Sequence, residues 1–408
     1  MQTKVSQAKS NPIAALKPRG CALSKGTAMA DEYVIPSTIV IFRRQPKMLH
    51  LVCLLFTFAL TYLTPLCRSR LPIPNTTFKE ATWFLPRASR LRLYSHIVPP
   101  RYGSALQSNM TLRDFILHPD GIHLAIAPAF FGFFAQFGAM QAWDEAMSSP
   151  STFDVLHSQI RGLAGSSAGA MTAVLLSSGI RPATAAEFCQ TVTIDKFADP
   201  PGFFAVFRGG LFHDIMRDFM QQQKPNDSLQ LQDGQIPVAV TAFDLKSMSG
   251  KVLTRGSMPL AARASACFPF LFQPVEWTDD TGSYYFVDGG IEDTWGLEGL
   301  TAFPSDNRKP KRVVHIAVGD YDGHKGPSKM PKGVDASEVV SISIRNTPQA
   351  GPLALENGPR AVAASRMAMH ATLDLPMYRG TEQGHYIIHI DTTDFIPMRD
   401  EAENEFKS

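Results

Sequence analysis

Two serines lie between glycines in the stretch GLAGSSAGAM, residues 162–171. Gly165, Ser167 and Gly169 have the G-x-S-x-G spacing of a sharp turn from a strand into a helix, which holds the central serine out from the backbone. Such a serine can act as a nucleophile when a neighbouring base takes its proton. Because so short a pattern also occurs by chance, a glycine- and serine-rich loop is the alternative. Ser166 points elsewhere in such a turn and is assigned no chemistry.

A carboxylate that could serve as this base is Asp288, which ends the aromatic stretch SYYFV and is followed by Gly289 and Gly290. An aspartate at the carboxyl end of a strand lies where open α/β sheets place their chemistry. A carboxylate shielded from water has a raised pKa, which suits a general base. The alternative is a hairpin turn, for which Asp-Gly is common.

The elements that must position these residues follow an α/β pattern from about residue 120, where short apolar runs alternate with helical patterns. Residues 122–130 predict a buried strand, and 131–147, apolar nearly all round, predict a buried helix. We expect residues 159–165 to form the strand that enters the serine turn and 168–179 the helix that leaves it. Further strands are predicted at 236–245, 312–320 and 385–392.

Composition excludes several classes of protein. The 408 residues are 44% hydrophobic and 19% charged, which suits one large folded domain with appendages, or two domains. The 39 basic and 37 acidic side chains leave a net charge of +2, so no nucleic-acid partner is expected. The cysteines are too few and too scattered for a disulfide framework or a metal site, and we predict neither metal nor cofactor. They are Cys21, Cys53, Cys67, Cys189 and Cys267.

The N-terminal part differs in kind from the rest. Residues 1–47 carry eight basic and two acidic side chains with little periodicity, which predicts a disordered or targeting segment. Residues 48–67 are uncharged and long enough to span a bilayer as a helix. This run is interpreted as a transmembrane anchor, as a signal sequence or as a core helix. An anchor implies membrane association in the endomembrane system, and a signal sequence implies the secretory pathway.

The remaining chain divides into three predicted parts. Residues 68–119 show no clear element and are expected to be a linker or irregular lead-in. Residues 120–395 are expected to form the folded domain. Residues 396–408 are expected to form a tail.

The two motifs together resemble the patatin-like phospholipase family of lipid acyl hydrolases. That family has a glycine-rich loop after its first strand, a G-x-S-x-G turn and a D-G-G or D-G-A. The similarity runs over about residues 120–295 and includes RGGLFHDIMRDFM (208–220) and AARASACFPFLFQPV (261–275). The resemblance implies a three-layer α/β/α fold with a largely parallel sheet, here preceded by an N-terminal hydrophobic helix. It also implies a catalytic dyad of Ser167 and Asp288 that needs no histidine.

The glycine-rich loop departs from the family pattern G-G-G-x-R-G, because the matching stretch reads APAFFGFF, residues 127–134. An ungapped match places Pro128, Ala129 and Phe130 on the three glycines and Gly132 on the arginine. A shift by one residue puts Gly132 on the last glycine, and the arginine is absent either way. Proline has no N–H, so the oxyanion hole is expected from the main-chain N–H groups of Ala129, Phe130 and Phe131.

Three hypotheses follow. The first is a membrane-associated serine hydrolase that cleaves acyl esters of phospholipids or glycerolipids, with phenylalanines of the two loops lining an acyl channel. The second, motivated by the altered loop, is a catalytically weak relative that binds lipid or a partner protein. The third is an α/β-hydrolase in which a later histidine completes a triad with Ser167 and Asp288. Its candidates are His315, His324, His370 and His385.

Overall fold

The computed structural model describes residues 107–147, 155–200, 205–303, 310–319, 330–352, 354–380 and 382–396. The predicted targeting segment, the apolar run 48–67 and all but the first residue of the predicted tail lie outside these residues. Within them, no helix has both the length and the apolar character needed to cross a membrane.

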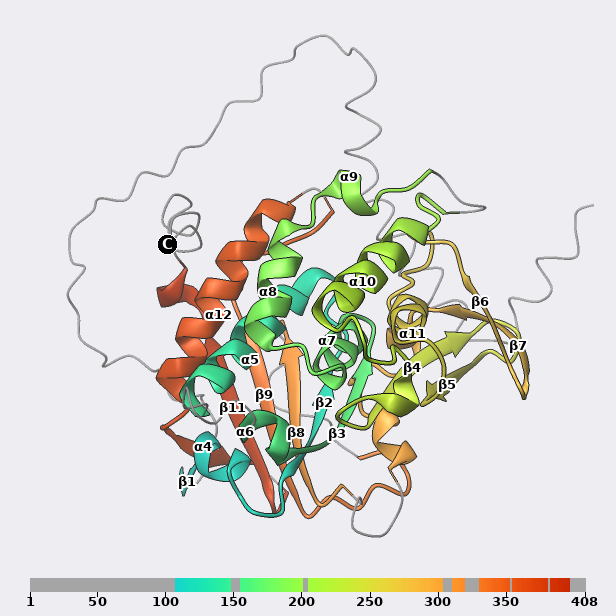
Figure 1. Cartoon of the computed structure of the whole chain (residues 1–408). Coiled ribbons are helices and arrows are strands. Elements are labelled where there is room, and N and C mark those ends of the chain that lie inside the picture. Colours follow the sequence, from blue (N-terminus) through green and yellow to red (C-terminus); the bar gives the residue numbers. More distant parts are fainter. Residues whose placement is uncertain are drawn as a thin grey trace, which may run out of the picture. The chain divides into compact units, whose positions relative to one another are not determined.

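A mixed sheet of eleven strands forms the centre of the described residues (Figure 1). Its six middle strands are parallel and lie in the order β11, β9, β8, β2, β3, β4. The largely parallel sheet and the mixed α/β class predicted from the sequence are confirmed. The six strands are β2 (Ile122–Ile126), β3 (Ile160–Ser166), β4 (Val238–Asp244), β8 (Arg312–Val318), β9 (Glu338–Arg345) and β11 (His385–Asp391).

Antiparallel strands extend the sheet at both ends. Beyond β11 lie β10 (Pro376–Arg379) and then β1 (Gln107–Thr111). At the other end β4 pairs with β5 (Ser249–Leu253) and with β7 (Gly282–Val287). The edge strand β6 (Val275–Asp279) pairs with β7. The antiparallel end therefore carries Asp288, which follows β7, to within reach of the parallel centre.

The sheet begins earlier than the sequence indicated. β1 and helix α4 (Leu112–Ile116) lie in the segment 68–119, for which no element was predicted. The strand has no clear alternation of apolar residues, and its partner β10 is distant in the sequence, so the pairing could not be read locally. Thr111 caps α4 by accepting from the N–H of Asp114, whose side chain accepts from the N–H of Thr111.

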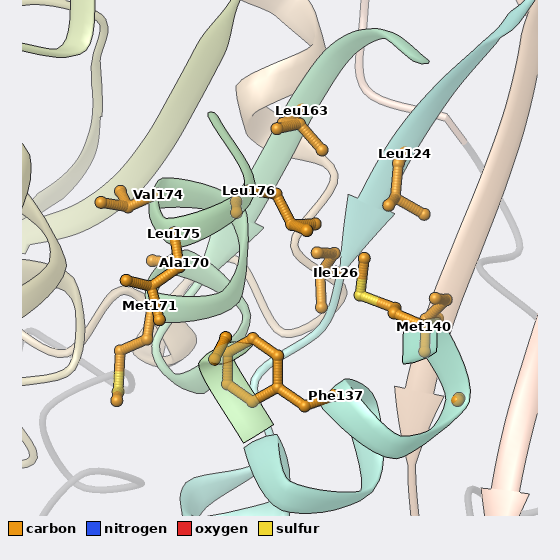
Figure 2. Packing of buried hydrophobic residues seen from close by; sticks show 14 of the residues in the cluster. Leu124, Ile126, Phe137, Met140, Leu163, Ala170, Met171, Val174, Leu175 and Leu176 are labelled. Carbon is orange, nitrogen blue, oxygen red and sulfur yellow. The ribbon is translucent and has the colours of Figure 1, made fainter. Parts of the chain in front are cut away.

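Helices cover one face of the sheet. Figure 2 shows apolar side chains of α5 and α7, among them Phe137 and Leu176, packed with Leu124, Ile126 and Leu163 of β2 and β3. This face forms the larger core. Besides α4, the α-helices of the described residues are α5 (Phe133–Met147), α6 (Val155–Gln159), α7 (Ala168–Ser177), α8 (Pro182–Thr191), α9 (Ile194–Phe197), α10 (Gly210–Gln223), α11 (Met258–Ser265) and α12 (Gly358–Thr372).

Helix α5 is buried on nearly all sides, as its sequence predicted, because α12 packs against the side that does not face the sheet. The two helices approach closely. A Cβ atom on Gly138 would lie 2.3 Å from the carbonyl oxygen of Val362, so a side chain there would force the helices apart. On the α12 side, small residues such as Ala361 and Ala364 are buried.

The opposite face of the sheet carries small residues. Ala125, Ala164 and Ala239 alternate with the larger residues of the first face, as the two-residue period of a strand requires. Within the described residues, this face is covered by the 3-10 helix η6 (Glu298–Ala302) and its neighbours. The other short 3-10 helices are η3 (Phe130–Gly132), η4 (Leu231–Asp233), η5 (Gly289–Ile291), η7 (Leu355–Asn357) and η8 (Thr393–Phe395).

Candidate active site

Ser167 occupies the predicted turn between β3 and α7. Its backbone has φ 53° and ψ −123°, a conformation that residues other than glycine rarely adopt. The glycines at 165 and 169 are explained by close approach alone, since neither has a positive φ. A Cβ atom on Gly169 would lie 2.1 Å from the carbonyl oxygen of Ile126, and one on Gly165 would lie 2.4 Å from that of Gly169. The positive φ at this turn is adopted by the serine itself.

Ser167 and Asp288 are brought together. The Ser167 hydroxyl donates a hydrogen bond of 2.6 Å to Oδ2 of Asp288. The other carboxylate oxygen, Oδ1, accepts from the N–H of Gly290 at 2.8 Å. Both side chains are buried, with Ser167 6% and Asp288 5% exposed. The carboxylate is thereby fixed in one orientation with one oxygen directed at the hydroxyl.

Burial raises the pKa of Asp288 from 3.8 to about 6, because charging a carboxylate away from water is unfavourable. The hydrogen bonds from Ser167 and from the N–H of Gly290 act in the opposite direction, since they stabilise the charged form. At neutral pH the carboxylate is therefore mostly ionised, yet it binds a proton far more tightly than an exposed aspartate does.

The two glycines after Asp288 are also required by close packing. A Cβ atom on Gly289 would lie 2.0 Å from the carbonyl oxygen of Thr241 in β4. A Cβ atom on Gly290 would lie 2.9 Å from Oδ1 of Asp288 and 3.1 Å from the ring of Pro128. Pro128, from the altered loop, thus lies beside the aspartate turn and helps to exclude water from it.

Ser265, at the end of α11, supports the strained backbone of the serine turn. Its hydroxyl oxygen accepts a hydrogen bond of 2.9 Å from the N–H of Ser167 and donates one of 2.6 Å to the carbonyl oxygen of Thr241. It is fully buried. Sequence reasoning missed this residue, although the stretch that contains it was part of the family resemblance.

The altered loop after β2 forms a tight turn. The N–H of Gly132 donates to the carbonyl oxygen of Ala129 at 2.6 Å, and Phe130 has a φ of 50°. Phe130 thus adopts a backbone conformation that glycine reaches without strain, at a position that the ungapped match aligns with a glycine of the family pattern. Phe130 and Phe131 line the same cavity as Ser167, whereas Ala129 does not.

Gln136 of α5 anchors the start of this loop. Its side-chain amide donates to the carbonyl oxygen of Ala127 at 2.9 Å, and its side-chain oxygen accepts from Thr172 of α7 at 3.0 Å. Gln136 is fully buried with both polar atoms paired. It connects the loop to the helix that follows Ser167, and the sequence, which predicts only an apolar helix there, did not single it out.

Ser167 and Asp288 lie in the wall of an apolar cavity. It encloses about 780 Å³ that atoms do not fill, part of it open to solvent. Apart from those two residues and Cys189, its walls are apolar. The remaining lining residues are Phe130, Phe131, Phe133, Phe134, Ala168, Met171, Phe188, Val192, Phe197, Phe212, Ile215, Met216, Ala266, Phe268, Leu271, Phe272 and Leu355.

The candidate histidines have other partners. His315 lies 2.9 Å from the carbonyl oxygen of Trp295, and burial lowers its pKa to about 4. His370 contacts Glu145 at 2.7 Å, and His385 contacts Ser341 at 2.9 Å. His324 lies outside the described residues.

Within the described residues, no hydrogen bond links a histidine to Ser167 or Asp288. In the same part of the chain no group of three or more histidine, cysteine, aspartate or glutamate side chains is arranged to hold a metal ion.

Comparison with known proteins assigns part of the chain to a family. Residues 129–300 match the family model described as patatin-like phospholipase, so the chain carries a patatin-like phospholipase domain. The match includes Ser167, Ser265 and Asp288. No curated protein sequence matches the chain.

Solved structures that match part of the chain include bacterial proteins. VipD from Legionella pneumophila has a TM-score of 0.37 and 14% identity, over 70% of this chain and 65% of that chain. The type III effector ExoU has a TM-score of 0.36 and 13% identity, over 62% of this chain and 53% of that chain. The ExoU–SpcU complex from Pseudomonas aeruginosa gives 0.34 and 14%, over 69% and 61%. The chain thus spans less than two thirds of the length of each.

Proposed function

We propose that the protein is a serine lipid acyl hydrolase that cleaves ester bonds of phospholipids or glycerolipids. The observation that supports this most directly is the 2.6 Å hydrogen bond from Ser167 to Asp288 in the wall of an apolar cavity. A fatty acyl chain would fill the cavity while its ester lies at the serine. No metal or cofactor takes part in the proposed reaction.

In the proposed reaction Asp288 accepts the hydroxyl proton as Oγ of Ser167 attacks the ester carbonyl. The bond from the carbonyl carbon to the alcohol oxygen then breaks, and the departing alcohol takes the proton from Asp288. An acyl-serine remains. Water, deprotonated by the same carboxylate, attacks the carbonyl carbon of the acyl-serine. The bond from that carbon to Oγ of Ser167 then breaks, Oγ takes the proton back from Asp288, and the fatty acid is released. A carboxylate with a pKa of about 6 is suited to both proton transfers.

The negative charge that develops on the ester oxygen needs hydrogen-bond donors. The N–H of Ser167 is not one of them, because it donates to Ser265. We infer that the loop N–H groups of Ala129, Phe130 and Phe131 supply donors, as expected from the sequence. The N–H of Ala168 is a further candidate, since it lies in the first turn of α7, where N–H groups lack intrahelical acceptors.

Labelling with a fluorophosphonate probe tests the proposal, because only an activated serine reacts. We expect wild type to be labelled and to hydrolyse acyl esters, and Ser167→Ala to do neither. Ser166→Ala is the matched control: Ser166 is the adjacent buried serine, and its hydroxyl has no hydrogen-bond partner among the described residues. Absence of both labelling and hydrolysis in a folded wild type would favour the catalytically weak lipid- or partner-binding protein.

Membrane association is a separate part of the proposal and is supported by the sequence alone. The uncharged run 48–67 would hold the chain on a membrane of the endomembrane system or direct it into the secretory pathway. Retention of the full-length protein in the membrane fraction after carbonate washing is expected for an anchor. A mature N-terminus just after residue 67 would identify a signal sequence instead.

A further inference from the structure

Three exposed apolar side chains border the wall of the apolar cavity. Ile194 of α9 is 39% exposed, Leu211 of α10 is 38% exposed, and Phe270, between α11 and β6, is 49% exposed. None of the three lines the cavity. Each is, however, within three positions of a lining residue in the sequence. We call these three residues the rim.

The elements that carry the rim are held together by the cavity wall itself. The ring of Phe272 lies 6.5 Å from that of Phe197 in α9 and 5.9 Å from that of Phe212 in α10. Asp199, just after α9, accepts from the N–H groups of Gly209 and Gly210 at the start of α10. The elements that carry the rim residues therefore pack against one another beside the cavity.

The backbone conformation and the exposure of Phe270 are both unfavourable for a phenylalanine. Its φ of 63° is one that phenylalanine rarely adopts, and its ring is not buried in return. The neighbouring backbone fixes this conformation, because the N–H of Val206 donates to the carbonyl oxygen of Phe270 and the N–H of Phe207 donates to that of Leu271. A large apolar ring on a rigid and strained turn is suited to insertion into an apolar partner.

Charges next to the rim indicate which partner it meets. Lys196 of α9 and Arg208, just before α10, are both exposed. The exposed carboxylate closest in sequence to them is Asp195. Two of the three exposed charged side chains within three positions of the rim are thus cationic. Apolar side chains with neighbouring cations fit the interface of a bilayer that contains anionic phospholipid.

We propose that the rim inserts into the surface of a phospholipid bilayer, so that an acyl chain passes from the bilayer into the cavity without crossing water. This inference rests on the proposed lipid hydrolase function, because it assigns the direction from which substrate reaches Ser167. It also assigns binding to a surface on the folded domain, separate from the run 48–67.

Tryptophan fluorescence tests the inference without any turnover. In a Ser167→Ala background, Phe270→Trp is compared with Leu245→Trp, which places the same probe at another exposed apolar position, after β4. Vesicles contain phosphatidylcholine and phosphatidylglycerol with brominated acyl chains, which quench only inserted indoles. Both variants retain residues 48–67, so the difference between them reports the rim. We expect a blue shift and several-fold stronger quenching for Phe270→Trp alone.

Two results would overturn the inference. Equal quenching of the two probes would show that the rim does not insert. A blue shift of Phe270→Trp that depends on protein concentration and needs no vesicles would assign the rim to contact between copies of the chain.

Hydrolysis provides the second arm. The variant Ile194→Ser/Leu211→Ser/Phe270→Asn uses asparagine at 270 because asparagine tolerates a positive φ. We expect hydrolysis of vesicle lipid to fall roughly tenfold or more, with hydrolysis of a dissolved short-chain ester unchanged. The matched control, Leu117→Ser/Leu245→Ser/Met367→Ser, alters exposed apolar residues elsewhere and should lose neither.

The hydrolysis comparison separates a failure of the rim inference from a failure of the proposed function. A rim variant that loses both activities equally, or a control that loses vesicle hydrolysis as strongly, contradicts the inference. A wild type without either activity contradicts the proposed function instead, and the fluorescence comparison then still tests the rim.

Discussion

The hydroxyl of Ser167 and the carboxylate of Asp288 meet over 2.6 Å although 121 positions separate them in the sequence. Strand β4 lies between the strands that precede them, parallel to β3 on one side and antiparallel to β7 on the other. The carboxyl end of β3 and the end of β7 that precedes Asp288 are both held by this one central strand.

Because the two residues act on the same proton, their removal should not be additive. We expect Ser167→Ala and Asp288→Asn each to lower ester turnover by about 10²–10⁴-fold or more, and the double variant to be no worse than the weaker single variant. Turnover with a chromogenic acyl ester measures all three. A double variant whose loss equals the product of the single losses would show that the residues act separately.

Activity should depend on the ionisation of Asp288. The carboxylate must be deprotonated to accept the hydroxyl proton, so kcat/KM should fall as pH drops below about 6 and reach a plateau above it. The pH dependence of labelling by a fluorophosphonate gives the same information without a leaving group. A half-point near 4, the ordinary value for aspartate, would contradict the raised pKa.

The free energy of unfolding should fall as pH rises, whereas activity should rise. A carboxyl whose pKa is raised on folding favours the folded state while it is protonated, and this contribution is lost as pH rises from 3.8 through about 6. The raised pKa corresponds to about 3 kcal/mol of unfavourable charging at neutral pH. Asp288→Asn, which cannot ionise, should therefore be inactive but unfold at a higher temperature than wild type at pH 8.

At pH 4 the advantage of Asp288→Asn should largely disappear, because the wild-type carboxyl is then protonated. Thermal unfolding at the two pH values provides the comparison. An equal difference in Tm at both would mean that the substitution acts through packing rather than through charge.

Ser265 should be a positioning residue for Ser167. Ser265→Ala leaves the N–H of Ser167 and the carbonyl of Thr241 unpaired, so we expect kcat to fall at least about tenfold with little change in KM. The matched control is Ser177→Ala. Ser177 is also fully buried and donates to a carbonyl, that of Ile236, at 2.7 Å, but contacts no part of the site.

Both serine variants should lose a similar free energy of unfolding, about 1–3 kcal/mol. If Ser177→Ala also loses turnover at saturating substrate, the effect of Ser265 is a general loss of stability and not a role in holding the nucleophile.

The backbone of Phe130, rather than its ring, should be what the reaction requires. Phe130→Gly removes the strain of a φ of 50° and keeps the main-chain N–H, so turnover should stay within about tenfold of wild type or rise. Phe130→Val places a β-branched side chain at the same φ and should lower both turnover and Tm. Equal behaviour of the two variants would show that loop conformation is not decisive.

The sequence predicted the parts of the site that depend on local geometry. Gly165 and Gly169 could be anticipated because a sharp strand-to-helix turn leaves no space for side chains, and the structure places main-chain carbonyl oxygens 2.4 Å and 2.1 Å from where their Cβ atoms would be. The Ser167 and Asp288 positions follow from the same local patterns. Their catalytic roles remain predictions.

Other parts depend on residues distant in the sequence and could not be predicted. Ser265 is important because it lies between the N–H of Ser167 and the carbonyl of Thr241, and no local pattern reports that position. The conformation of Phe130 was hidden because phenylalanine seldom has a positive φ. Strand β1 was missed because its partner is near the other end of the domain.

The packing of α5 against α12 has a consequence during synthesis. A chain emerging from the ribosome completes α5 long before α12, and until then the side of α5 that later contacts α12 remains exposed to water. Residues 129–300, the part that matches the family model, lack α12 altogether. A protein truncated at residue 300 should therefore aggregate, and a productive C-terminal boundary lies beyond β11, after residue 391.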